Sequence, residues 1–109
     1  MPELTPKEIL IKARKLIEKP EHWCRLHFAL DENGVVVTTN SPAAKCFCIT
    51  GALCNASKED SPVWSNVVYS AYEALWQHSP VMRKALADFN DSPLTQHKDI
   101  LELFDKFIS

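Results

Sequence analysis

A proline preceded by serine or threonine occurs five times, and at four of these places it predicts where a helix begins. The four dipeptides are Thr5-Pro6, Ser41-Pro42, Ser61-Pro62 and Ser79-Pro80. A hydroxyl side chain at the N-cap accepts a hydrogen bond from an unpaired amide of the first turn. Proline at the first helical position has a suitable φ and no amide hydrogen that needs a partner. We therefore expect a helix to start at each of these dipeptides.

The residues after Thr5 strengthen the first of these starts. Glu8 lies three positions later and completes a capping box. Apolar side chains then recur at helical spacing on one face until Pro20, at Ile9, Leu10, Ala13, Leu16 and Ile17. This pattern predicts an amphipathic helix with one packed face. Its basic residues are interpreted as a solvated face, with a membrane surface or RNA as the alternative contact: Lys12, Arg14, Lys15 and Lys19.

From Trp23 onward the apolar residues alternate, which is the period of a strand. The alternating set is Cys24, Leu26, Phe28 and Leu30, against Arg25, His27 and Ala29. A second β-favouring run covers Val35 to Thr39, and Asn33-Gly34 between the two runs is a strong turn signal. The segment therefore predicts a β-hairpin with its turn at Asn33-Gly34.

The stretch from Pro42 to Ala56 allows two interpretations. Its only strongly polar side chains are Lys45, Thr50 and Asn55. A helix here would be apolar nearly all round and therefore buried, and Gly51 would let a neighbour approach closely. The alternative is a strand over residues 45–50, because Cys-Phe-Cys-Ile-Thr contains β-favouring residues. The Ser-Pro start and the alanines favour the helix.

Three more helices are predicted in the second half of the chain. The first runs from Pro62 to about His78, and a short one follows Pro80. Thr95 is expected to cap the last helix.

The sequence Asn90-Asp91-Ser92-Pro93 is predicted to form the turn between the last two helices. Together with the hairpin, these elements predict an α+β fold: one helix-rich domain over residues 1–109, with about five helices and one β-hairpin. A chain of 109 residues is long enough for a single core.

Charge and composition exclude several classes of partner. Twelve basic residues stand against fourteen acidic ones, which does not suit nucleic acid binding. Two glycines in the whole chain nearly exclude a glycine-rich nucleotide loop. No segment has the apolar length of a membrane span, and the N-terminus has no apolar stretch of signal-peptide length. We expect a cytoplasmic protein with no membrane contact and no cofactor.

The four cysteines, Cys24, Cys46, Cys48 and Cys54, are expected to be reduced. On a helix Cys46 and Cys54 would lie about 80° apart while Cys48 points away, which argues against a shared metal ion. On a strand Cys46 and Cys48 would share a face, and zinc binding with His22 or His27 would be feasible. Burial in the core is the favoured role, and a metal site or a reactive thiol are the alternatives.

Three aromatic residues are candidates for a partner surface: Tyr69, Tyr72 and Trp76. Tyrosine and tryptophan contribute strongly to interface energetics, although they are also common in cores. Core burial is the alternative for all three.

Short motifs follow one another along most of the chain. They are Trp23-Cys24, Cys48-Ile49-Thr50-Gly51-Ala52-Leu53, Phe89-Asn90-Asp91, Thr95, Asp99-Ile100-Leu101 and Phe104-Asp105. Their order resembles a family of short bacterial and phage proteins classed as a domain of unknown function, with WC, CxxGAL, WND, T, DVL and FD in succession. Phe89 stands where that family usually has tryptophan. The resemblance implies no activity. A shared binding site would gather Trp23, Cys24, Cys48, Asn90 and Asp91, which combine an aromatic wall, thiols and polar groups.

The sequence contains no recognisable catalytic pattern of paired carboxylates or of serine, histidine and aspartate. We expect a non-catalytic interaction or regulatory module that binds a protein partner or itself, with no catalytic residue or metal ligand assigned. The alternative is a thiol-dependent enzyme or small metal-binding protein centred on Cys24, Cys46 and Cys48. The family resemblance adds a phage or host-defence accessory protein as a third possibility.

Overall fold

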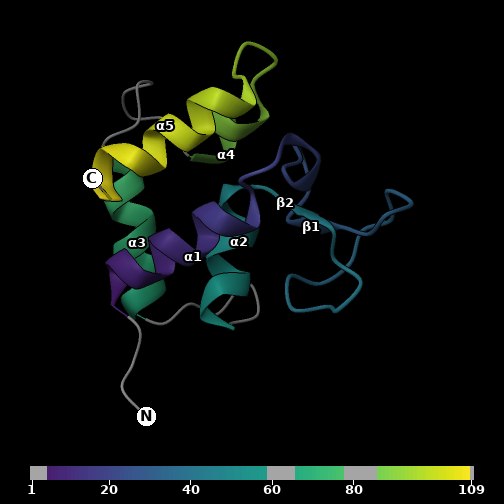
Figure 1. Cartoon of the computed structure of the whole chain (residues 1–109), viewed down its shortest axis with the longest axis horizontal. Coiled ribbons are helices and arrows are strands. Elements are labelled where there is room, and N and C mark those ends of the chain that lie inside the picture. Colours follow the sequence, from purple (N-terminus) through teal and green to yellow (C-terminus); the bar gives the residue numbers. More distant parts are fainter. Residues whose placement is uncertain (1–4, 59–65, 78–85, 109) are drawn as a thin grey trace.

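The computed structural model describes residues 5–58, 66–77 and 86–108 (Figure 1). Within these ranges the chain forms five α-helices, one 3₁₀ turn and two short strands. In chain order they are α1 (Pro6–Leu16), η1 (Pro20–His22), β1 (Ala29–Leu30), β2 (Cys46–Phe47), α2 (Ile49–Ser57), α3 (Asn66–Gln77), α4 (Leu86–Asp91) and α5 (His97–Ile108). The predicted α+β class, rich in helix with one antiparallel hairpin, is confirmed.

Helix α1 begins as its capping residues predict. The Thr5 hydroxyl accepts a hydrogen bond from the Glu8 amide at 3.2 Å, and the Thr5 amide donates to the Glu8 carboxylate at 3.1 Å. The apolar face of α1 is buried, and Arg14 on its other side forms an ion pair with Asp105 of α5 at 2.7 Å. The predicted amphipathic helix is confirmed.

The core lies between the helices. Helix α1 packs against α2, α3 and α5, and of these helices α2 lies next to strand β2 (Figure 1). Nearly every residue of α2 is buried, as expected for a helix that is apolar nearly all round. The largest fully buried apolar side chains are Phe104, Ile9, Leu10, Ile17, Ile49, Leu53, Leu75, Ile100 and Leu103. No helix in the described parts of the chain combines the length and the apolar character needed to cross a membrane.

Helix α2 starts seven residues later than Ser41-Pro42 predicts, so that predicted start is wrong. The Ser41 hydroxyl accepts a hydrogen bond from the Ala43 amide at 3.1 Å and stabilises a turn. The chain then extends to form β2, which confirms part of the strand alternative. The N-cap of α2 is Cys48, whose sulfur accepts a hydrogen bond from the Gly51 amide at 3.3 Å.

The hairpin is present, but its second strand is not the predicted one. Strands β1 and β2 are antiparallel, with Ala29 opposite Phe47 and Leu30 opposite Cys46. The run over residues 35–39 contributes one isolated bridge, from Val36 to Leu30.

The turn between these runs is as predicted. Gly34 has a φ of 79°, and the Asp31 amide donates to the Val35 carbonyl at 2.9 Å. The Asp31 carboxylate accepts hydrogen bonds from the amides of Asn33 and Val35, at 2.8 and 2.9 Å. This carboxylate therefore closes the turn.

Two details near the last helices correct the predictions. Asn90 and Asp91 are the last residues of α4 and do not lie in a turn, which instead follows at Pro93 and Leu94. Helix α5 begins two residues after Thr95, where the Asp99 carboxylate accepts a hydrogen bond from the Gln96 amide at 2.9 Å. The predicted starts at Ser61-Pro62 and Ser79-Pro80 lie outside the described residues.

Candidate functional site

The side chain of Asn90, at the end of α4, connects three separate parts of the chain. It is only 1% exposed. Its Oδ1 accepts hydrogen bonds from the Trp23 indole at 2.7 Å and from the Ile49 amide at 3.1 Å. Its Nδ2 donates to the Cys24 carbonyl and to the Asp91 carboxylate, both at 3.0 Å. Asn90 therefore ties residues 23–24 and the start of α2 to α4.

The neighbouring Asp91 holds the next part of the same segment. Its Oδ1 accepts a hydrogen bond from the Leu26 amide at 2.8 Å. Leu26 has a φ of 72°, a left-handed conformation that is uncommon for a residue with a Cβ atom. The backbone thus turns at Leu26 next to the Asp91 carboxylate, and unusual backbone of this kind is often found at functional sites.

Arg25 and Trp23 add a second connection to the start of α5. The guanidinium of Arg25 lies 4.5 Å from the centre of the Trp23 ring and donates to the Thr95 carbonyl. The Trp23 ring also lies 5.9 Å from the ring of His97. These contacts fix residues 23–26 against α4 and α5 through both polar groups and aromatic rings.

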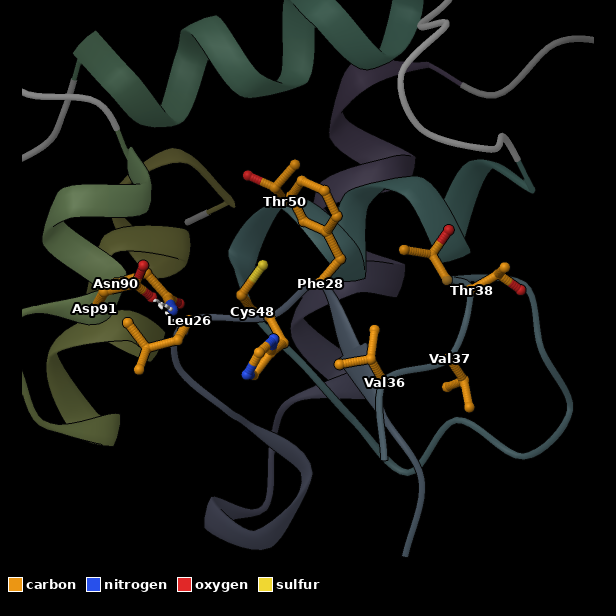
Figure 2. Close-up of a pocket in the computed structure, with 11 residues that line it drawn as sticks. Leu26, Phe28, Val36, Val37, Thr38, Cys48, Thr50, Asn90 and Asp91 are labelled. Atoms are coloured by element: carbon orange, nitrogen blue, oxygen red, sulfur yellow. Dashed lines mark hydrogen bonds between the residues drawn. The ribbon is translucent and has the colours of Figure 1, made fainter. Parts of the chain in front are cut away.

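A cavity of about 820 Å³ lies beside this segment. Figure 2 shows Leu26, Asn90 and Asp91 on one side, Val36, Val37 and Thr38 on the other, and Phe28, Cys48 and Thr50 between them. His27 and Thr39 complete the lining. Asp91 is thus at one end of a cavity whose middle and far side are mainly apolar.

Large apolar side chains surround the opening of this cavity. Leu26 is 74% exposed, Val36 59% and Phe28 48%, whereas Ala29 is fully buried. The apolar alternation over residues 24–30 therefore does not form an inward face. The reason is geometric, because regular strand begins only at Ala29 and the chain turns at Leu26. Two apolar residues of the expected strand, Leu26 and Phe28, line the cavity instead.

Gly51 allows the cavity wall to lie directly on α2. A Cβ atom at Gly51 would lie 1.9 Å from the carbonyl oxygen of Phe28. The same carbonyl accepts a hydrogen bond from the Cys48 amide. The close approach expected at Gly51 is confirmed, and the neighbour is the backbone of a cavity residue.

Three cysteines lie near the site, and all four in the chain are free thiols. Burial is the main cause that raises the pKa of the Cys24 thiol, the neighbouring Cys46 and Cys48 thiols raise it further, and the negative charge of Asp91 contributes least. Burial also raises the pKa of Cys48, although the amides of Gly51 and Thr50 act in the opposite direction. Both thiols are therefore neutral at physiological pH. In the described part of the chain, no group of three or more histidine, cysteine or acidic side chains is placed to hold a metal ion.

The structure brings the five proposed binding residues together. Cys48, Asn90 and Asp91 line the cavity, while Trp23 and Cys24 bond to Asn90 and support the wall. The three aromatic residues proposed as a partner surface lie on α3 and are not among the lining residues of the cavity. Tyr69 and Trp76 are exposed, and Tyr72 is partly buried against the core.

Sequence reasoning missed most of the cavity lining. The missed residues are Leu26, His27, Phe28, Val36, Val37, Thr38, Thr39 and Thr50. The signal that was available is the apolar pattern on both sides of Asn33-Gly34, which was interpreted only as strand structure.

Comparison with known protein families supports the family resemblance indicated by the order of the motifs. The model of a family of unknown function, DUF6197, matches residues 1–109. The chain belongs to this family. No curated protein and no solved structure matches it. Because the family's description gives no activity, the function of this member has to be argued from the cavity and the network that supports it.

Proposed function

We propose that this domain is a non-catalytic binding module that holds an apolar segment of a protein partner in the cavity beside Asp91. The proposal rests on one observation. A cavity of about 820 Å³ opens between the apolar side chains of Leu26, Val36 and Phe28, which are 74%, 59% and 48% exposed. Ligand-binding cavities commonly measure about 300–1,000 Å³ and combine apolar walls with a few polar groups. Exposed apolar patches next to polar groups are typical of interaction sites.

The exposure of the opening favours a segment of a larger partner over a small enclosed ligand. Leu26 and Val36 extend into solvent on opposite sides of the cavity (Figure 2). A small molecule within the cavity would leave much of both side chains in water. A partner that covers them would gain about 1.5–3 kcal/mol for each large apolar side chain fully buried, before the cost of association is subtracted.

The state of the thiols supports binding over catalysis. A nucleophilic or metal-binding cysteine needs an accessible thiolate, which a lowered pKa provides. Burial raises the pKa of both Cys24 and Cys48. This counts against an enzyme or metal protein centred on these cysteines. The four free thiols also suit a reducing compartment, so we propose the cytoplasm as the location.

A pair of adjacent valines provides the test. Val36 lines the cavity and is 59% exposed, and Val35 is 57% exposed but lies outside the lining. In a fluorescence titration with the neutral apolar dye N-phenyl-1-naphthylamine, we expect saturable binding that Val36→Ser weakens by roughly five-fold. Val35→Ser is the matched control and should leave the titration unchanged. Equal effects of the two substitutions would contradict binding in the cavity.

The kind of partner is tested by peptide display. Peptides enriched on the native domain and on Val35→Ser, but lost on Val36→Ser, would support a partner segment in the cavity. A concentration-dependent dimer that Val36→Ser dissociates would instead identify a second copy of the chain as the occupant. A library that yields no peptide dependent on Val36 would count against a protein partner.

A further inference from the structure

The carboxylate of Asp91 is held in one orientation by neutral groups. Its Oδ1 accepts hydrogen bonds from the Leu26 amide at 2.8 Å and from Asn90 Nδ2 at 3.0 Å. Neither donor carries a charge. Two donors on one oxygen fix the rotation of the carboxylate group and occupy both lone pairs of that oxygen. The second oxygen, Oδ2, makes no hydrogen bond to any residue that the structure describes.

No cation within the described ranges neutralises Asp91. The ion pairs found there both involve Arg14, which is not among the lining residues of the cavity. The other titratable groups of the lining are His27 and the Cys48 thiol. The cavity therefore contains one negatively charged group at one end, with mainly apolar walls over the rest of its length (Figure 2).

We propose that the partner segment carries a primary ammonium group, from a lysine side chain or a chain N-terminus, which binds Asp91 Oδ2 while the adjacent apolar part lies against Phe28 and Val36. This inference rests on the proposed binding function and adds the chemistry of the ligand. A partly desolvated carboxylate attracts a cation more strongly than one in bulk water, and it disfavours an anionic ligand. The single available oxygen suits a compact ammonium better than a guanidinium, which pairs best with both oxygens of a carboxylate.

Three probes with the same eight-carbon chain test the inference: octylammonium, octanol and octanoate. We expect all three to displace N-phenyl-1-naphthylamine, and we expect the affinity to fall from the ammonium to the alcohol to the carboxylate. The ammonium should bind roughly five-fold more tightly than the alcohol. Higher salt should reduce this ratio, because ions screen the charge interaction. The salt dependence is measured on the native protein and needs no variant.

Asp91→Asn removes the charge and keeps Oδ1 as the acceptor for the Leu26 amide. In this variant the ratio of ammonium to alcohol affinity should fall to about one. Asp88→Asn is the matched control, because it makes the same charge change at an exposed position of α4 outside the cavity lining. It should keep the native ratio.

The outcomes separate this inference from the proposed function. Equal binding of all three probes, still weakened by Val36→Ser, would overturn the ammonium assignment and leave the apolar binding function intact. Failure of every probe to displace the dye, together with dye binding that Val36→Ser leaves unchanged, would overturn both. A ratio that survives Asp91→Asn, or one that is insensitive to salt in the native protein, would also overturn the role of Asp91.

Discussion

The helical side of the molecule and the cavity side are stabilised in different ways. Helices α1, α2, α3 and α5 pack through fully buried apolar residues such as Leu10, Leu53 and Phe104. Around the cavity the strands are only two residues long, and the central buried side chain is the polar Asn90. On the helical side the largest aliphatic residues are mostly buried, whereas on the cavity side Leu26, Phe28 and Val36 are about half exposed or more.

This difference shows that regularly spaced apolar residues can be buried in one region of the chain and exposed in another. In α1 the periodic apolar residues form the core, because the helix is covered by three others. Over residues 24–30 two of the periodic apolar residues, Leu26 and Phe28, remain exposed, because side-chain hydrogen bonds hold the backbone in place. Buried apolar side chains stabilise the helical side, whereas the hydrogen bonds of Asn90 and Asp91 stabilise the cavity side. The apolar side chains of the cavity side remain available for a partner.

The largest expected effect comes from Gly51→Ala, because Gly51 is where the two sides meet. Its new Cβ atom would lie 1.9 Å from the Phe28 carbonyl oxygen, so backbone must move. We expect a loss of about 4 kcal/mol in the free energy of unfolding, measured by urea denaturation. Gly34→Ala is the control, since a Cβ atom there meets nothing within 4 Å and only the positive φ is unfavourable. It should cost about 1 kcal/mol. Similar losses for both variants would contradict the close contact.

The next largest effect is expected for Asn90→Ala, which removes the centre of the polar network. The substitution leaves the Trp23 indole, the Ile49 amide and the Cys24 carbonyl without their partner. Buried groups left unpaired in this way cost about 1–3 kcal/mol each, and relaxation reduces the sum, so we expect a loss of about 3 kcal/mol. Dye binding to the cavity should weaken in parallel.

Asn55→Ala provides the comparison for this substitution. Asn55 donates one hydrogen bond, to the Thr39 carbonyl at 2.6 Å, so its removal should cost only about 1 kcal/mol in urea denaturation. If Asn90→Ala were no more harmful than Asn55→Ala, the cavity side would not depend on the network, and the contrast with the helical side would fail.

Elements with local signals could be predicted from the sequence. The capping box and apolar face of α1 require residues no more than a few positions apart, and both are present in the structure. The turn after β1 is similar, because Asp31 and Gly34 determine it locally. The Ser41-Pro42 signal failed because the same local chemistry also stabilises a short turn, and pairing of β2 with β1 decides between them.

The candidate site could be predicted only in part. Trp23 and Asn90 are 67 positions apart, and no local pattern reveals that an indole donates to that amide. The order of the family motifs placed Trp23, Cys24, Cys48, Asn90 and Asp91 in one group, and the structure brings them together. The motifs gave no indication that Asn90 ends a helix. The cavity was missed because its walls come from segments whose pairing is long-range.

The smallest expected effect concerns the pH dependence of stability on the cavity side. Burial raises the pKa of Cys24 and Cys48 in the folded state. Folding therefore favours the neutral thiols. Their contribution is complete below the pKa of an unfolded thiol, about 8.5, and is lost as the pH rises above it. We expect the free energy of unfolding under reducing conditions to fall more steeply between about pH 8 and pH 10.5 in the native protein than in a Cys24→Ser and Cys48→Ser double variant.

The comparison isolates the thiols, because all other groups that titrate in this range are the same in both proteins. Serine at position 48 can still cap α2 through the Gly51 amide, so the variant keeps its helix start. Parallel pH profiles would show that the thiols do not experience the buried surroundings of the cavity wall. A steeper fall of the free energy of unfolding in the native protein would show that the stability of the cavity wall depends on the Cys24 and Cys48 thiols remaining neutral. Asp91 would then be the one fixed negative charge among the described lining residues, and the charge that a cationic partner segment would meet.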